Sequence, residues 1–303
     1  RDKKVSLTIF TPTYNRAYCV GRLYQSLVNQ TDKNFIWLVI DDGSTDNTEE
    51  LISTFIRDGK IEVRYVKQKN GGKHVAFNHA LDLCTTDLFT CVDSDDYLTN
   101  VAVETILSTY KSIAAEKYLG MYFRQIHQNG ADVARPYPKG VRKVGITELY
   151  HRFRFRGDTM IVLRKDLIGN VRFPTFPGER FVTERVFYNE LDRIAPMYLC
   201  EDRIYVSEYL PDGYTANANR LAVSNPYGSA YAFLSEAHYS LKNLDKVKNY
   251  AQYLAFMEIF NLQMPKKENC FTLSRTTCFG GKLLKGHYVR LYRGHVRQIV
   301  NHS

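Results

Sequence analysis

Apolar runs near the start of the chain alternate with segments whose apolar positions recur at helical spacing. The β-rich runs are Val5–Phe10, Phe35–Ile40, Ile61–Val66 and Leu88–Val92. Helical spacing follows the first three, at Val20, Leu23, Leu27 and Val28, at Leu51, Ile52 and Phe55, and at Val75, Ala76, Ala80 and Leu83. Strands that are largely apolar and alternate with helices are typical of a parallel sheet covered on both faces. The pattern therefore predicts an α/β fold.

A polar loop follows each predicted strand. The loops are Thr11–Asn15, Asp41–Asp46, Asn70–His74 and Asp93–Asp96. In the second loop, Asp46 and Glu49 have the spacing of a capping box, which predicts the start of the second helix there. The carboxyl ends of parallel strands meet at one edge of a sheet, where such sheets bind ligands. We therefore expect the four loops to form one composite site.

The fourth loop is rich in carboxylates, with Asp93, Asp95 and Asp96 directly after the strand. Hard oxygen ligands suit Mg2+ or Mn2+, which usually keep coordination positions open for the phosphates of a nucleotide. Taken alone, the loop also fits a polar turn with an N-cap for the helix expected near Asn100. The three other loops at the same edge favour a site for a metal-bound diphosphate.

Four motifs coincide with these strand ends. They are Thr-Pro-Thr-Tyr-Asn-Arg16, Val-Ile-Asp-Asp-Gly-Ser-Thr-Asp46, Asn-Gly-Gly-Lys73 and Val-Asp-Ser-Asp-Asp96. In order and spacing they resemble the inverting family 2 glycosyltransferases of the bacterial surface-polysaccharide type. The resemblance is close over residues 1–100 and looser to residue 215. It implies the GT-A fold, a Rossmann-like, mostly parallel central sheet with helices on both faces.

The resemblance also implies a domain plan and an activity. Residues 1–100 would be the nucleotide-sugar-binding half, residues 101–220 the acceptor-binding half, and residues 221–303 a C-terminal helical, basic appendage. The enzyme would be a metal-dependent inverting transferase of the hexosyl- or N-acetylhexosaminyltransferase class, with Mn2+ or Mg2+ as cofactor. It would move a sugar from a nucleotide-diphosphate sugar, with UDP favoured, to a hydroxyl of a glycan or lipid-linked acceptor.

Individual roles carry over to the matched positions. Pro12 and Thr13 would line the base. Of the pair Asp41 and Asp42, the second is favoured as the carboxylate that accepts from the uracil ring, and a capping role near Ser44 is the alternative. Further donor-side positions in the matched motifs are Tyr14, Asn15, Arg16, Gly72 and Ser94.

The phosphate and metal positions follow from the third and fourth motifs. Lys73 would meet the base or the diphosphate, because a cation at a helix start opposes the helix dipole and an anionic ligand would compensate it. Its alternative is a solvated cation. Asp95 would be the main metal ligand, and Asp93 would touch the ribose or the metal. Asp96 would bind the metal or orient the donor sugar.

A hydroxyl that attacks an anomeric carbon loses its proton as the new bond forms, so the acceptor half must supply a base. The segment Phe176–Arg185 resembles the family segment in which an acidic residue opens a helix facing the acceptor. Glu184 is the candidate base and Glu179 the reserve, although a carboxylate in a first helical turn is also favoured by the dipole alone. The family often has Glu-Asp where this chain has Glu184-Arg185.

Weaker acceptor-side candidates come from two turns. Asp158 precedes the predicted strand Thr159–Leu163 and would contact acceptor hydroxyls or cap the turn. Asp212 and Tyr214 lie in Tyr209–Thr215, whose Pro and Gly mark a turn by chemistry alone.

The pattern changes after about Asn225, where two helices are expected before Pro265. Beyond them, Gly280–Val300 mixes cations with Leu, Tyr and Val and supplies much of the net charge of +9. Such a segment would lie on an anionic membrane or form a basic solvated helix that packs by one face. Its glycines weaken any long amphipathic helix.

Composition bounds the remaining possibilities. No stretch approaches the roughly eighteen apolar residues of a membrane span, and the charged start leads into a strand, which predicts a cytoplasmic chain. Docking by the basic C-terminal segment would place it at the inner face of the cell membrane. The six cysteines have no paired metal spacing, so neither disulfides nor structural zinc are expected.

Three other functions each fit part of this sequence. Nucleic-acid binding would suit the positive charge, but no nucleic-acid motif accompanies it. A sugar nucleotidyltransferase would need a glycine-rich, basic first loop, which Thr11–Arg16 is not. A catalytically inactive nucleotide-binding or membrane-scaffold protein with the same fold remains the alternative, and intact carboxylates at Asp93, Asp95 and Glu184 argue against it.

Overall fold

The computed structural model describes residues 6–208, 218–264 and 271–300. The chain divides into two compact units. Unit 1 comprises Arg1–Val171 and Leu191–Leu210, and unit 2 comprises Arg172–Glu190 and Pro211–Ser303. The segment Arg172–Glu190 therefore belongs with the C-terminal helices, although it lies between two parts of unit 1 in sequence.

Unit 1 is built on a sheet that has nine strands in the described residues, in the order β3-β2-β1-β4-β8-β6-β9-β5, with β7 paired to β9. The strands are β1 (Leu7–Thr13), β2 (Phe35–Asp41), β3 (Val63–Lys67), β4 (Leu88–Cys91), β5 (Tyr97–Leu98), β6 (Gly120–His127), β7 (Lys143–Val144), β8 (Thr159–Arg164) and β9 (Met197–Ser207). Strands β1 to β4 are parallel. Strand β8 runs antiparallel to β4 and β6, and β6 pairs in parallel with β9. The expected mostly parallel α/β sheet is confirmed.

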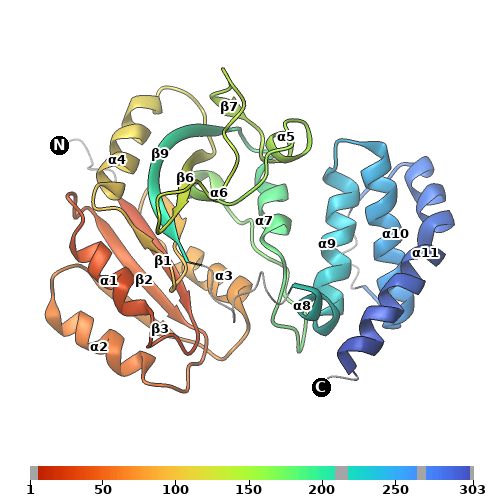
Figure 1. Cartoon of the computed structure of the whole chain (residues 1–303), viewed down its shortest axis with the longest axis horizontal. Coiled ribbons are helices and arrows are strands. Elements are labelled where there is room, and N and C mark those ends of the chain that lie inside the picture. The colour runs from red at the N-terminus through yellow and green to blue at the C-terminus, as the bar shows by residue number, and fades with distance from the viewer. Residues whose placement is uncertain (1–5, 209–217, 265–270, 301–303) are drawn as a thin grey trace. The chain divides into compact units, whose positions relative to one another are not determined.

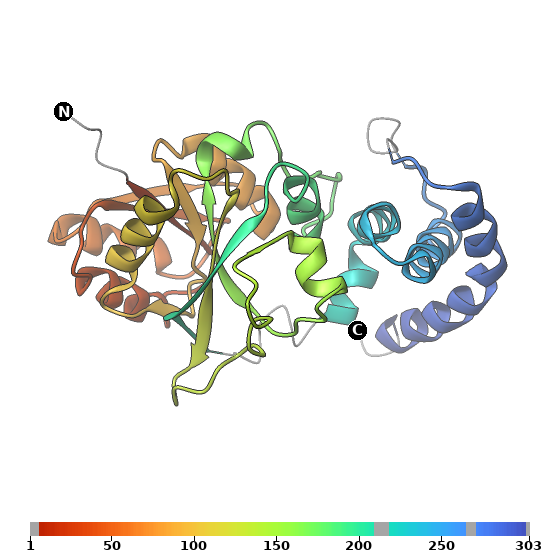
Figure 2. The same ribbon diagram turned by 90° about the horizontal axis from the view of Figure 1, so that it is seen from above.

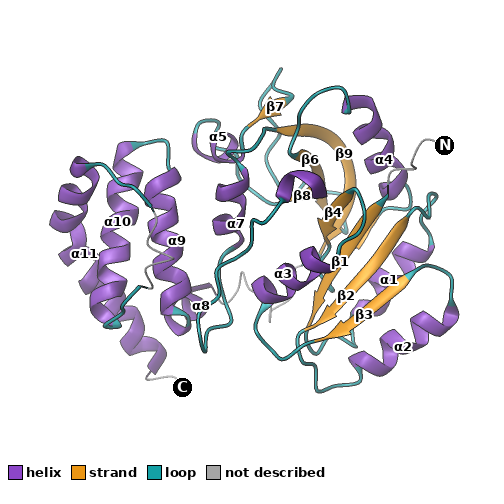
Figure 3. Cartoon of the chain, turned by 180° about the vertical axis from the view of Figure 1, so that it is seen from behind, coloured by secondary structure: helices purple, strands orange, loops and turns teal. Residues whose placement is uncertain are grey.

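Helices cover both faces of this sheet (Figures 1 and 3). The helices α1 (Val20–Val28), α2 (Thr48–Asp58) and α4 (Ala102–Ile113) pack on one face, where Ile9 and Trp37 join their core. Helix α3 (Lys73–Leu83) lies on the other face, where the Phe77 ring is 5.5 Å from that of Phe10. Neighbouring β1 residues thus point to opposite faces, as the pleat requires. Two short helices, α5 (Ile146–His151) and α6 (Lys165–Ile168), complete unit 1.

The described residues of unit 2 contain helices and loops but no strand. It contains α7 (Glu184–Leu191), α8 (Ala218–Ser224), α9 (Pro226–Tyr239), α10 (Asn243–Ile259) and α11 (Arg275–Val300). Helix α10 contacts both α9 and α11, and Figure 2 shows these helices side by side. Ala230, Leu234, Tyr253 and Phe256 form the buried core of this bundle. The two helices expected after Asn225 are confirmed as α9 and α10.

Some local expectations need correction. Strand β1 continues through Thr13, so Thr11–Thr13 is strand rather than turn. Helix α2 begins at Thr48 with Asn47 as N-cap, and Asp46 instead accepts a hydrogen bond of 3.0 Å from the Thr48 amide. The Asp46 carboxylate binds the amide of Thr48, two residues further on, so the chain turns at Asn47 and the helix begins one residue later than expected.

Helix α11 is continuous despite its glycines, and two of them explain how it packs. A Cβ on Gly281 would lie 2.5 Å from Tyr250 Cδ1, and one on Gly280 would lie 3.0 Å from Val247 Cγ1. Both contacts are with α10. The missing side chains therefore let α11 approach α10 closely, and this packing offsets the low helix propensity of glycine.

Two further observations concern membrane spans and cysteines. Among the residues that the structure describes, no helix is both long enough and apolar enough to cross a membrane. Within the described residues, Cys19, Cys84, Cys91, Cys200 and Cys278 form no disulfide, and Cys270 lies outside the described ranges.

Candidate functional site

The four predicted loops meet at the carboxyl edge of β1 to β4. The register pairs Thr13 with Asp41 and Asp41 with Lys67, so these strands end level with one another. The fourth loop follows β4, which pairs with β1 on its other side. Hydrogen bonds between the loops then fix their conformations.

Asn15 ties the first loop to the second. Its backbone is left-handed, with φ of 53°, a conformation that Asn tolerates better than most residues. The Asn15 side-chain oxygen accepts from the Thr45 amide at 2.8 Å, and the Asn15 amide donates to Ser44 Oγ at 2.8 Å. Next to it, the Arg16 amide donates to Thr48 Oγ1. The Asn-Arg end of the first motif thus organises the backbone around the second loop.

The Asp41–Asp42 pair is buried and fully engaged. Asp41 accepts from the Ser44 amide at 2.7 Å and from the Tyr65 hydroxyl at 2.5 Å. Asp42 is 5% exposed. The contact to Ser44 that the sequence allowed for Asp42 is therefore made by Asp41.

Asp42 instead holds the third loop. Its Oδ1 accepts from the Gly71 amide and from Gln68 Nε2, both at 2.8 Å, and its Oδ2 accepts from the Gly72 amide at 2.7 Å. Gly72 has φ of 90°, which favours glycine at this position. In this structure Asp42 shapes the loop that presents Lys73.

Lys73 joins the third loop to the fourth. Its ammonium lies 2.7 Å from Asp93 Oδ1 and 3.0 Å from Oδ2. Lys73 is the first residue of α3, where a cation opposes the helix dipole. From the sequence we expected an anionic ligand to compensate the charge of Lys73. In the structure, the Asp93 carboxylate compensates it.

The other two carboxylates of the fourth loop have different surroundings. Asp96 accepts from the Tyr205 hydroxyl at 2.5 Å and from the Glu208 amide at 2.8 Å. Burial, and then the charge of Asp93, raise the pKa of Asp96 to about 7. Asp95 is half-buried, and burial followed by the charge of Asp93 raises its pKa as well. A bound cation would relieve this clustering of negative charge.

Asp95 differs from Asp41, Asp42 and Asp96 in its partners. Within the described residues, no other residue donates a hydrogen bond to its carboxylate, while its backbone oxygen accepts from Arg22 at 2.9 Å. Its main chain is therefore held in place and its side-chain oxygens remain available as ligands.

A divalent ion fits this donor set. Mg2+ and similar ions are commonly held by one or two carboxylates together with substrate phosphates. Among the described residues there is no group of three or more His, Cys, Asp or Glu side chains that could hold a metal ion by itself. Asp93 and Asp95 would supply the protein ligands, and a nucleotide diphosphate the rest.

The remaining donor-side candidates lie around the same edge. Pro12 is half-buried, Ser94 is buried, and Tyr14 is 46% exposed. The Thr13 hydroxyl is buried and has no hydrogen-bond partner in the described residues. A buried hydroxyl of this kind is suited to bind a ligand group or a water molecule.

Three residues of the site were missed by the sequence analysis. Tyr205 and Glu208 come from the end of β9 and bind Asp96, and Arg22 of α1 forms an ion pair with Glu208. These partners are far from the fourth loop in sequence and belong to no motif. Only the pairing of β5 with β9, Tyr97 with Val206, brings them close.

The acceptor-side candidates Glu184 and Glu179 lie in unit 2. Glu184 is the first residue of α7, as predicted. Glu179 accepts from the amides of Tyr227 and Gly228, both at 2.7 Å, and so caps the start of α9. Burial raises the pKa of Glu179.

Arg185 stands where the family often has Asp, and its contacts show what an arginine does at this position. Its guanidinium binds both oxygens of Glu236, at 2.9 and 3.0 Å, and Asn189 donates to the same carboxylate at 2.8 Å. The second position of the motif therefore ties α7 to α9.

Two other candidates are placed differently. Asp158 lies in unit 1, directly before β8 and after Gly157, whose φ is 105°. Asp212 and Tyr214 lie outside the described residues.

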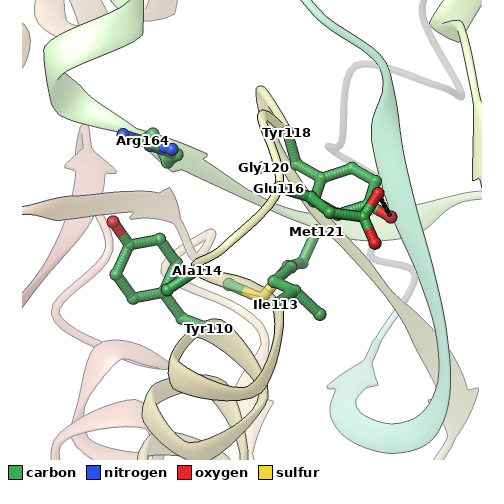
Figure 4. Close-up of a pocket in the computed structure, with 8 residues that line it drawn as sticks. All are labelled: Tyr110, Ile113, Ala114, Glu116, Tyr118, Gly120, Met121 and Arg164. Atoms are coloured by element: carbon green, nitrogen blue, oxygen red, sulfur yellow. Dashed lines mark hydrogen bonds between the residues drawn. The ribbon is translucent and has the colours of Figure 1, made fainter.

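A shallow surface hollow lies elsewhere in unit 1, and Figure 4 shows its lining. Its residues include Tyr110 of α4, Gly120 at the start of β6 and Arg164 of β8. Arg164 pairs with Leu88, the first residue of β4. Since Asp93–Asp96 follow the other end of β4, this hollow is at the opposite edge of the sheet from the four loops.

The fold and the carboxyl-edge loops define an α/β protein with a composite polar site at the carboxyl ends of its parallel strands. The sequence profile of glycosyl transferase family 2 matches residues 8–172, more than half of the 303 residues. The chain belongs to this family.

Comparison with known proteins gives related glycosyltransferases. Glycosyltransferase GlyG of Streptococcus pneumoniae is 24% identical over 214 residues, which are 66% of this chain and 69% of GlyG. The GalNAc(5)-diNAcBac-PP-undecaprenol beta-1,3-glucosyltransferase of Campylobacter jejuni is 25% identical over 175 residues, 55% of this chain. This chain spans about half of that relative, 54% of its length.

Solved structures share the fold. S. aureus TarS 1–349 in complex with UDP-GlcNAc superposes with a TM-score of 0.59 at 18% identity, covering 97% of this chain and 92% of that one. A mannosyltransferase from Pyrobaculum calidifontis in complex with GDP-Man and Mn2+ gives a TM-score of 0.52 at 14% identity, covering 100% of this chain and 77% of that one.

Proposed function

We propose that this glycosyltransferase moves a sugar from a UDP-sugar to a hydroxyl of a glycan or lipid-linked acceptor, with inversion and with a divalent metal. In this proposal residues 1–100 bind the donor, residues 101–220 bind the acceptor, and residues 221–303 form the appendage. Pro12, Thr13 and Asp42 serve the base.

The contrast between carboxylates at the carboxyl edge carries this proposal. Asp42 and Asp96 accept hydrogen bonds from several protein donors, whereas the Asp95 carboxylate has no donor from another residue among the described residues. Burial, and then the charge of Asp93, raise the pKa of Asp95. Two clustered acidic groups beside Lys73 suit a cation that carries a diphosphate. If these aspartates served only to hold the loops in place, we would expect each of them to accept hydrogen bonds from the protein, as Asp42 and Asp96 do.

Asp93 and Asp95 would hold the metal, Mn2+ or Mg2+, which when bound supplies positive charge that stabilises the departing diphosphate. Lys73 adds a second positive charge at the same edge. The Mn2+ in the related mannosyltransferase structure supports a divalent ion here.

Glu184 would remove the acceptor proton. As the hydroxyl oxygen attacks the anomeric carbon, the bond to the diphosphate breaks on the opposite face, so the configuration inverts, and the proton passes to the Glu184 carboxylate. Asp158, Asp212 and Tyr214 would contact the acceptor. Glu179 already binds two amides of α9, which supports a structural role beside its place as reserve base.

Relatives support the choice of substrates. The TarS structure contains UDP-GlcNAc, and the Campylobacter relative is named for an undecaprenol-linked acceptor. A lipid-linked acceptor would place the reaction at the inner, cytoplasmic face of the cell membrane, in the synthesis of a surface polysaccharide.

Thermal unfolding with Mn2+ and a panel of UDP-, GDP- and dTDP-sugars tests the donor site. A ligand at a hundred times its dissociation constant stabilises the folded state by about 2.7 kcal/mol, which raises the midpoint measurably. We expect a Mn2+-dependent rise with UDP-sugars. No rise with any donor would contradict the proposal and favour the alternative, an inactive scaffold with the same fold.

A further inference from the structure

Helix α11 exposes large apolar side chains on its outer side. Phe279 is 68% exposed and Leu283 is 70% exposed. The two residues are four positions apart and so lie on the same face of the helix. Leu284 and Leu291, exposed by 38% and 45%, border this face. Since Gly281, Val289 and Tyr292 lie on the side packed in unit 2, the apolar face does not belong to the core of the bundle.

The same helix is strongly basic. From Arg275 to Ser303 the sequence has no Asp or Glu, and its Lys and Arg residues are Arg275, Lys282, Lys285, Arg290, Arg293 and Arg297. Lys285 and Arg293 form ion pairs with Glu258 of α10. Lys282 and Arg290 are exposed. Helical spacing places Lys282 about one turn from Phe279, and Arg290 on the same face about two turns beyond Leu283. The outer face therefore combines apolar and cationic side chains.

This combination decides between occupants. A second copy that docked through the same face would set cations against cations, because the segment contains no acidic residue to meet them. Large apolar side chains that are exposed side by side mark an interaction surface, which a purely solvated helix does not need. An interfacial helix needs apolar side chains that enter the acyl boundary and cations that meet anionic headgroups.

We propose that the outer face of α11, defined by Phe279, Lys282, Leu283 and Arg290, binds the surface of a bilayer rich in anionic phospholipid. Membrane binding by this face would bring the enzyme to a lipid-linked acceptor, so the inference rests on the proposed function for its biological role. Its test uses lipid alone, so it succeeds or fails independently of sugar transfer.

The experiment is co-sedimentation of the full chain with vesicles of phosphatidylcholine, alone or with about one third phosphatidylglycerol. We expect binding to the anionic vesicles at least tenfold tighter than to neutral ones, weakening as salt rises. Each exposed cation contributes about fivefold, so Lys282→Glu with Arg290→Glu should weaken binding at least tenfold. Phe279→Ser with Leu283→Ser should do the same through lost apolar burial.

The matched control is Leu244→Ser with Lys248→Glu, an exposed apolar and cationic pair on α10, which should bind like wild type. Far-UV circular dichroism confirms that each variant is folded, and the UDP-sugar thermal shift reports the donor site separately. Equal binding to both vesicle types, or unchanged binding by the α11 variants, overturns the proposal. So does a wild-type dimer that the Phe279 and Leu283 substitutions convert to monomer, because a second copy then covers the face.

Discussion

The aspartates at the carboxyl edge of the sheet differ in whether the protein binds their side chains. Asp42 accepts three hydrogen bonds from the third loop, which hold the backbone that presents Lys73. The Asp95 main chain accepts a hydrogen bond from Arg22, while its carboxylate has no donor from another residue in the described part of the chain. Substitution at the first position should disturb loop structure, whereas substitution at the second should disturb ligand binding alone.

Asp95→Asn and Glu184→Gln separate the two proposed roles. Asn keeps the shape of Asp95 but removes its charge, so the Mn2+-dependent thermal shift with UDP-sugar should disappear along with transfer. Glu184→Gln should lower the transfer rate about 100-fold or more, the usual contribution of a general base, while the donor shift stays normal. Glu190→Gln on the same helix is the control. Near-normal turnover by Glu184→Gln would reject this base and bring Glu179 forward.

His74 gives a pH dependence that can be checked without substrate. It is 3% exposed, and burial lowers its pKa from 6.5 to about 4. Between these two values the unfolded chain binds more protons at this site than the folded chain does. Its contribution to stability is therefore complete above pH 6.5 and is lost as the pH falls toward 4.

The measurement is urea unfolding of wild type and His74→Gln across this pH range. The free energy of unfolding of wild type should fall more steeply with acid, by at most one proton's slope. Only the difference between the two proteins is diagnostic, because Asp96, with its pKa raised to about 7, contributes with the opposite sign in an overlapping range. Parallel curves would show that His74 is not buried in its neutral form.

At the scale of elements, the sequence predicted the strand–loop–helix units because each is encoded locally. Phe35–Ile40 became β2, and the apolar positions from Val75 became α3. Partners across the fold had no local signal: Tyr205 is 109 residues from Asp96, to which it donates. For the same reason, the sequence could not show whether Lys73 pairs with Asp93 or with a bound ligand. Periodicity defines elements, and only the pairing of strands defines which side chains meet.

The sequence also does not show which glycines of α11 lie against α10, and two of these glycines give a matched pair of variants. A Cβ at Gly281 would clash with Tyr250, whereas one at Gly286 would meet nothing within 4 Å. Gly286→Ala should therefore stabilise unit 2 by about 0.8–1 kcal/mol through helix propensity. Gly281→Ala gains the same propensity but overpacks the α10 contact, which costs about 1–3 kcal/mol, so it should be neutral or destabilising.

Urea unfolding followed by far-UV circular dichroism compares these two variants. The sign of their difference is the test, since both have the same chemical change on the same helix. If Gly281→Ala were as stabilising as Gly286→Ala, α11 would not approach α10 as closely as the structure has it.

For the whole molecule, the two units provide separate spectroscopic signals. The chain has a single tryptophan, Trp37 of β2, which is fully buried and donates to Thr11 Oγ1 at 3.0 Å. Its fluorescence therefore reports the unfolding of unit 1. Far-UV circular dichroism is weighted toward helices and so includes the bundle of unit 2.

A chain that ends at Met264 lacks α11 and loses the contacts of Tyr292 with Phe256 and Gln252. Apolar surface of α10 would then be exposed, which should lower the thermal midpoint of the bundle. We expect the circular dichroism transition to move down while the Trp37 transition and the UDP-sugar shift stay near wild type. Non-coincident transitions would follow, because separate units need not unfold together. If both signals moved down together, the two units would unfold as one cooperative system, and α11 would stabilise the donor site as well as its own bundle.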